Sequence, residues 1–158
     1  MTDPTFELAN AHRWFAEHLN NQVWDLLRLE QLTPAQRELM RNTAHAAWRH
    51  WWEIGDVINH QRTECLLAHV HVALLEPAAA VHHAERSLQL AGEAGESYGA
   101  FDQVYSHDAA ASAYQISGSA HEAQHHRSKV EAARALLTDQ TEQRVANEWL
   151  NRRESAAN

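Results

Sequence analysis

The chain has 158 residues, 44% of them hydrophobic and 22% charged, so it is long enough and apolar enough to form one domain with a substantial core. Its formal net charge of −8 argues against nucleic acid as a partner, because nucleic-acid sites cluster Lys and Arg, and Lys129 is the single lysine. The single cysteine, Cys65, excludes an internal disulfide and fits a reducing compartment.

No stretch of the sequence is long and apolar enough to span a bilayer, and its first four residues do not open a signal peptide. We therefore expect a cytoplasmic protein with no membrane partner. Five glycines and three prolines are few, whereas residues that favour helices are abundant, and no strand-like alternation is visible. Composition thus predicts a single all-α domain over residues 1–158.

The first predicted helix is capped at residues 3–4 and runs to about Gln31. The segment Thr33–Gln36 is a capping box with proline at the first helical position, which predicts a second helix over Pro34–Ile54. Gly55–Asp56 combines a helix stop with a good N-cap, so a third helix should start there. If that break failed, the second and third helices would fuse.

The third predicted helix, residues 56–75, is apolar nearly all the way round and should be buried between neighbours. Pro77 opens a fourth helix, which ends near Ala94 and whose apolar residues recur at steps of three and four. The connection at Glu76–Pro77 is so short that these two helices must fold back on each other.

Three more helices are predicted, over residues 98–117, 120–137 and about 139–153. A second capping box, Ser119–Glu122, starts the middle one of the three. The last helix has no partner of its own, so we expect it to cover the exposed face of the final hairpin.

The helices that open at Pro34, Pro77 and Ala120 start at a constant spacing of 43 positions. A fixed period in this range is typical of stacked helical hairpins, each burying an apolar face against the next. The sequence therefore predicts about seven helices, arranged as stacked antiparallel helical hairpins with a C-terminal capping helix.

Small and aromatic residues around the turns carry a family resemblance. They are Ala110, Ala111, Tyr114, Gly118, Glu122 and Ala123 in one unit, and Leu67, Ala68, His71, Leu75 and Ala80 in the preceding one. On these residues, which span about 56–137, the chain resembles the tetratricopeptide repeat family, although its period of 43 is longer than that family's ~34.

The resemblance implies a right-handed stack whose first helices line a concave groove that holds peptides or partner proteins. The positions that would face this groove are Arg62, Cys65, His69, Tyr105, Asp108, Ser112 and Gln115.

Three of these positions carry reactive groups. Cys65 and His69 are four apart and share a helix face, and Asp108, 43 residues after Cys65, would face them from the neighbouring hairpin. Such a set can hold zinc or activate a nucleophile. The alternative is a buried thiol that packs as a small hydrophobe beside a hydrogen-bonded histidine.

Histidine is abundant, with 13 in the chain. The pairs His82–His83 and His125–His126 lie on successive second helices, where they could approach each other, and His121 and His125 are four apart. These side chains could bind zinc or nickel. The alternative is a solvated polar helix face.

The function that we expect first is a non-catalytic, protein- or peptide-binding module that needs no cofactor and can also self-associate as a homodimer. The alternative is a histidine-based sensor of a metal or small ligand. An enzyme built on Cys65, His69 and Asp108 is the third hypothesis. The sequence holds no phosphate-binding loop, nucleophile elbow or zinc-protease motif.

Overall fold

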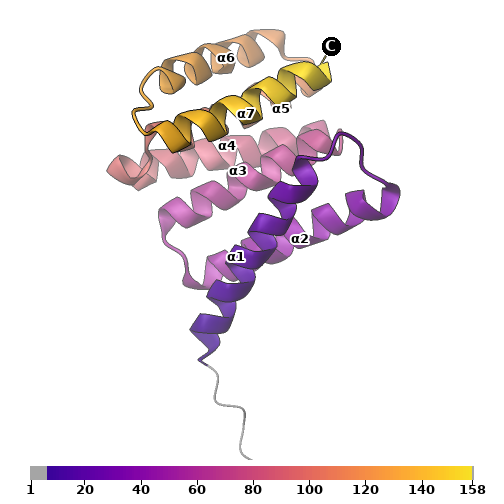
Figure 1. The fold of residues 1–158 in the computed structure, drawn as a ribbon, viewed down its shortest axis with the longest axis vertical. Helices are drawn as coiled ribbons and strands as arrows, with labels where there is room; N and C mark the ends of the chain where they lie inside the picture. Colours follow the sequence, from indigo (N-terminus) through magenta and orange to yellow (C-terminus); the bar gives the residue numbers. More distant parts are fainter. Residues whose placement is uncertain (1–6, 158) are drawn as a thin grey trace, which may run out of the picture.

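The computed structural model describes residues 7–157, with side chains as far as residue 153, and this part of the chain is all-α without any strand. The described helices are α1 (Leu8–Leu27), α2 (Pro34–Ile54), α3 (Val57–Ala73), α4 (Pro77–Ala94), the short 3-10 helix η1 (Gly95–Ser97), α5 (Ala100–Ser117), α6 (Ala120–Arg134) and α7 (Gln140–Ala157) (Figure 1). The predicted all-α class and seven α-helices are confirmed for these residues.

Local chemistry at the helix starts explains several boundaries. The Thr33 hydroxyl accepts a hydrogen bond from the Gln36 backbone N–H at 3.2 Å, and the Gln36 side chain accepts one from the Thr33 N–H at 2.9 Å. Asp56 and Asn59 exchange the same pair of bonds at the start of α3. These two capping boxes satisfy N–H groups that the helices leave free, and they make α2 and α3 separate helices, as the break at Gly55 predicts.

Several predicted boundaries differ from the structure. α1 ends at Leu27 instead of Gln31, α5 begins two residues later than expected, and α6 ends at Arg134 because the chain then turns Leu137 into the core. The predicted capping box at Ser119–Glu122 is wrong. Ser119 has a ψ of 74°, outside the extended conformation of a capping residue, and its side chain makes no cap. The cap proposed at residues 3–4 lies outside the described part of the chain.

Consecutive helices pack as pairs: α1 with α2, α3 with α4, and α5 with α6. Each pair is joined by a short turn, so its helices run in opposite directions. The pairs follow one another along the molecule, with α1 and α2 at one end, α3 and α4 in the middle, and α5, α6 and α7 at the other end (Figure 1). Contacts of α3 with α1, α2, α4 and α5 bury it on most sides, as its apolar sequence predicts.

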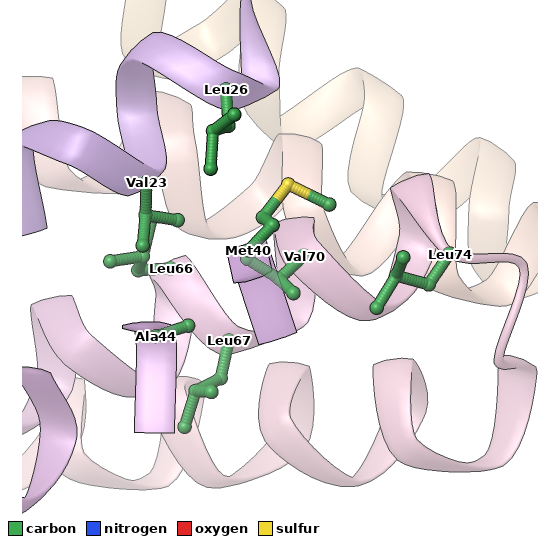
Figure 2. Close-up of a cluster of buried hydrophobic side chains, with 8 residues drawn as sticks. All are labelled: Val23, Leu26, Met40, Ala44, Leu66, Leu67, Val70 and Leu74. Atoms are coloured by element: carbon green, nitrogen blue, oxygen red, sulfur yellow. The ribbon is translucent and has the colours of Figure 1, made fainter. Parts of the chain in front are cut away.

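Three apolar clusters hold the pairs together. Aliphatic side chains of α1, α2 and α3 form the first cluster, which consists of Val23, Leu26, Met40, Ala44, Leu66, Leu67, Val70 and Leu74 (Figure 2). The second joins α3, α4 and α5 and is built mostly from alanines, which let the helix backbones approach closely. The third joins α5, α6 and α7 around Val104, Val130 and Trp149.

The turns that end α3 and α5 have the same geometry. Leu75 and Gly118, 43 positions apart, both have positive φ, at 59° and 85°. The following N–H group then donates to the carbonyl five residues earlier in each turn, Glu76 to His71 and Ser119 to Tyr114, at 2.9 Å in both. This is the helix-ending motif in which a left-handed residue closes the last turn.

The ring contacts behind these turns repeat as well. His71 and His83 stack with their planes 5° apart, and the residues 43 positions later, Tyr114 and His126, stack with planes 4° apart. The hairpins α3–α4 and α5–α6 therefore share one turn geometry and one ring contact at positions 43 residues apart.

Candidate functional site

A cavity of about 520 Å³ opens between the first helices of the hairpins. It is lined by side chains of several helices, among them Trp24 of α1, Cys65 of α3, Phe101 and Tyr105 of α5, and Val145 of α7. We call this cavity the groove. Its size and its mainly apolar, partly aromatic walls are those of a site for a small ligand or a few side chains.

The mouth of the groove carries a fixed ion pair between α3 and α5. Arg62 donates from Nε and Nη2 to the two carboxylate oxygens of Asp102, at 2.7 and 3.0 Å. This two-point hydrogen bonding raises the pKa of Arg62, and it keeps the guanidinium plane in one orientation. The Arg62–Asp102 ion pair makes this part of the groove polar, and its two opposite charges add no net charge.

The floor of the groove is polar and buried. Gln61 is fully buried, and its Nε2 donates to Ser87 of α4 at 2.9 Å and to Ser106 of α5 at 2.7 Å. Ser87 donates in turn to the Gln61 carbonyl oxygen, and Ser106 to that of Asp102. Because these bonds join three helices, they fix the spacing of α3 and α5 along which the groove runs.

The C-terminal helix α7 packs against the first helices through Trp149. Trp149 lies in an aromatic cluster, 5.2 Å from Trp24, 5.1 Å from His69 and 5.9 Å from Tyr105 between ring centroids. Its indole N–H donates to Asp108 at 2.9 Å. Trp149 thus anchors α7 against helices α1, α3 and α5 at once, and Figure 1 shows α7 lying over α5.

Asp108 is the electrostatic centre of this α7 contact. Burial raises its pKa, although Arg153, whose Nε lies 3.4 Å away, and the Trp149 N–H favour the ionised form. Burial holds the pKa of His69 well below its usual range, so this ring is neutral, and its Nε2 donates to the Tyr105 carbonyl at 3.2 Å. The other ring nitrogen, Nδ1, therefore carries no proton and donates no hydrogen bond to Asp108, whose carboxylate oxygen is 3.9 Å away.

Cys65, the third reactive residue of this set, is buried, and burial raises the pKa of its thiol to about 12. The thiolate is the nucleophilic and metal-binding form of cysteine. At neutral pH, Cys65 is therefore a protonated thiol packed among alanines of the second cluster.

The structure divides the seven predicted groove positions. Arg62, Cys65 and Tyr105 line the groove. Asp108, Ser112 and Gln115 line a second cavity, of about 700 Å³, between α5, α6 and α7. His69 is fully buried beneath Trp149, between the two groups. The resemblance implies one continuous face along the first helices. In the structure, α7 lies across this face and separates it into the two cavities.

The predicted histidine set is dispersed. His83 packs against His45 and His71, whereas His125 packs against His126, and no ring contact joins the two predicted pairs in the described residues. The His121 side chain is 94% exposed. In the described residues, no group of three or more His, Cys, Asp or Glu side chains is placed so that it could hold a metal ion.

Sequence reasoning missed two groups of residues. The first is the aromatic wall from α1 and α7, Trp24 and Trp149. One period of 43 residues before Arg62 is residue 19, which is next to Asn20. Asn20 lines the groove one helical turn before Trp24, so the period itself could have extended the groove to α1. The second is the meeting of His45, His71 and His83, whose positions follow no common spacing.

No helix in the described part of the chain has the length and apolar character needed to cross a membrane. Comparison with known proteins finds no matching family model, no matching curated protein and no matching solved structure.

Proposed function

We propose that this chain is a non-catalytic, tetratricopeptide-repeat-like module that binds a segment of a partner protein in the groove. Two findings support the repeat interpretation: the identical turns at Leu75 and Gly118, and the packing of each hairpin against the next. In such a stack, the first helices form the binding face, and the groove lies between α1, α3 and α5.

The observation that carries the proposal is the way in which α7 binds the same face. α7 inserts one large aromatic side chain, Trp149, among rings of three helices and places Arg153 beside a buried carboxylate. The face formed by the first helices therefore accepts a helix that presents an aromatic anchor. The open groove next to it has aromatic walls of the same kind, Trp24, Phe101 and Tyr105. We infer that its occupant is a peptide segment with an aromatic or large aliphatic anchor.

The buried groups beside the groove favour binding over catalysis. A nucleophile must be activated by a lowered pKa or a neighbouring base. The Cys65 thiol has a pKa raised to about 12, and the His69 ring is buried with Nε2 committed to a backbone carbonyl.

Peptide-display selection against the purified chain tests the proposal. Asn20, a half-buried residue that lines the groove, is replaced by tryptophan so that the larger side chain occupies part of the groove. Gln89→Trp, at an exposed position of α4, is the matched control. We expect the selected peptides to bind the wild-type chain and Gln89→Trp equally and to lose at least about tenfold in affinity for Asn20→Trp, which is roughly 1.4 kcal/mol. Peptides that bind all three proteins equally would show that the groove is not their site.

A further inference from the structure

Three histidines from three helices meet on the side of the molecule formed by α2, α3 and α4. His45 comes from α2, His71 from the end of α3 and His83 from α4. Their ring centroids are 5.7 Å apart for His45–His71, 5.2 Å for His71–His83 and 6.1 Å for His45–His83. We propose that these three imidazoles are the protein ligands of a divalent transition-metal ion, zinc in the first instance.

The first argument is the spacing of the rings. Zn–N bonds are ~2.0–2.1 Å long, so two imidazoles bound to one tetrahedral zinc have centroids roughly 5 Å apart. The three observed separations lie close to this value. Binding thus requires the rings to turn, but does not require the helices to move.

The second argument is that two of the rings have the carboxylate partners that metal-bound histidines commonly have. His71 Nδ1 lies 2.6 Å from a Glu76 carboxylate oxygen, and His83 Nδ1 lies 2.7 Å from one of Glu64. A carboxylate at Nδ1 fixes the proton there and leaves the Nε2 lone pair free, which is the usual outer support of a histidine–zinc bond.

The supporting carboxylates are held in turn. The Trp48 indole N–H donates to the second oxygen of Glu64 at 2.8 Å, and Arg41 forms an ion pair with Glu76. These contacts hold both carboxylates from α2, the same helix that supplies His45. Histidines on a solvated surface do not require carboxylate partners that are themselves held in place, so these contacts favour a ligand-binding role.

The third argument is an unpaired buried atom. His71 is only 5% exposed, and its Nε2 is buried without a hydrogen-bond partner. A buried polar atom ordinarily has a partner, so this nitrogen is available to a ligand.

The fourth argument is access. His45 is exposed, so an ion can reach the cluster from solvent and the His45 ring is free to turn toward it. In the described residues the rings are not yet turned to a common point, since those of His71 and His83 are nearly parallel. Imidazole ligands suit zinc or nickel, and water would take the fourth position.

Calorimetric titration of the chelator-treated full chain with zinc chloride, and separately with nickel chloride, tests the site. We expect one equivalent of zinc to bind the wild type. His45→Ala, at an exposed position that does not endanger the fold, should weaken binding at least about tenfold, and Glu64→Gln should weaken it by ~10–100-fold through loss of the outer support. Circular dichroism checks that each variant remains helical.

His121→Ala removes a fully exposed histidine and is the matched control, with unchanged affinity expected. Absence of zinc binding by the wild type would overturn the proposal. So would binding that survives His45→Ala but is lost in His121→Ala, because that result describes adventitious surface histidines. Asn20→Trp should leave zinc binding unchanged, so this test stands apart from that of the groove. Nickel bound at the same three residues without zinc would overturn the choice of metal.

Discussion

Replacing Trp149 by phenylalanine tests whether α7 is held as described. The change removes the indole N–H that donates to buried Asp108 at 2.9 Å and keeps an aromatic ring among Trp24, His69 and Tyr105. A hydrogen bond to a buried charged group contributes ~1.5–3 kcal/mol, and Arg153 remains beside Asp108, so we expect a loss of about 2 kcal/mol in the free energy of unfolding. For a chain of this size that corresponds to roughly 4–8 °C in Tm.

A double-mutant cycle isolates this bond. Trp149→Phe, Asp108→Asn and the double variant are unfolded in urea and followed by far-UV circular dichroism. We expect a coupling energy of about 1–2 kcal/mol between the two positions. The matched control is Trp14→Phe, at a side chain that is 58% exposed, which should change stability by less than ~0.5 kcal/mol. A coupling energy within error of zero would refute the reasoning, because Trp149 and Asp108 would then not be bonded in solution.

Three further outcomes follow from the structure. Burial lowers the pKa of His107 to about 4, so the stability contributed by its neutral form should be lost as pH falls from about 6.5 towards 4. In His107→Gln, the urea midpoint of unfolding should change less over this pH range than in the wild type. Burial raises the pKa of Asp108, so its protonated form stabilises the fold at low pH. The free energy of unfolding of the wild type should therefore fall relative to that of Asp108→Asn as pH rises from ~4. Parallel stability–pH profiles of the two proteins would contradict this expectation. At the two equivalent turns, Leu75→Gly should raise the free energy of unfolding by about 0.5–1 kcal/mol, and Gly118→Ala should lower it by about 1 kcal/mol. The reason is that a left-handed backbone conformation suits only glycine well. Changes of the same sign and size in the two variants would argue against equivalent turns.

Helix positions could be predicted because their signals are local. The Thr33–Gln36 box and the proline at Pro77 specify helix starts within four residues of sequence, and the structure follows them. Ser119 shows the limit of such signals: its sequence fits a capping box, but Gly118 before it adopts a left-handed conformation and turns the Ser119 backbone away from the capping geometry. The conformation of the preceding turn therefore determines whether the capping hydrogen bonds form, and the four-residue sequence pattern alone does not.

The candidate sites depend on contacts between distant residues, which spacing alone does not determine. Arg62, Cys65 and Tyr105 could be placed at the groove because the period relates α3 to α5. The packing of Trp149 against Trp24 could not, because α7 lies outside the 43-residue spacing of helix starts and its rotation about its own axis is set by side-chain fit. The same holds for His45, which meets His71 and His83 only through the crossing of α2 over the next hairpin.

A hydrogen bond joins the first and last described helices, in addition to the Trp24–Trp149 ring contact. The Arg152 guanidinium of α7 donates to the carbonyl oxygen of Arg28 at the end of α1, across 124 positions of sequence. In a linear array, each hairpin interacts only with its neighbours and can unravel from either end. Here the terminal helices support each other, so opening one end also weakens the other. Amide hydrogen exchange should therefore show similar protection in α1 and α7, and the molecule should melt as one cooperative unit instead of fraying hairpin by hairpin.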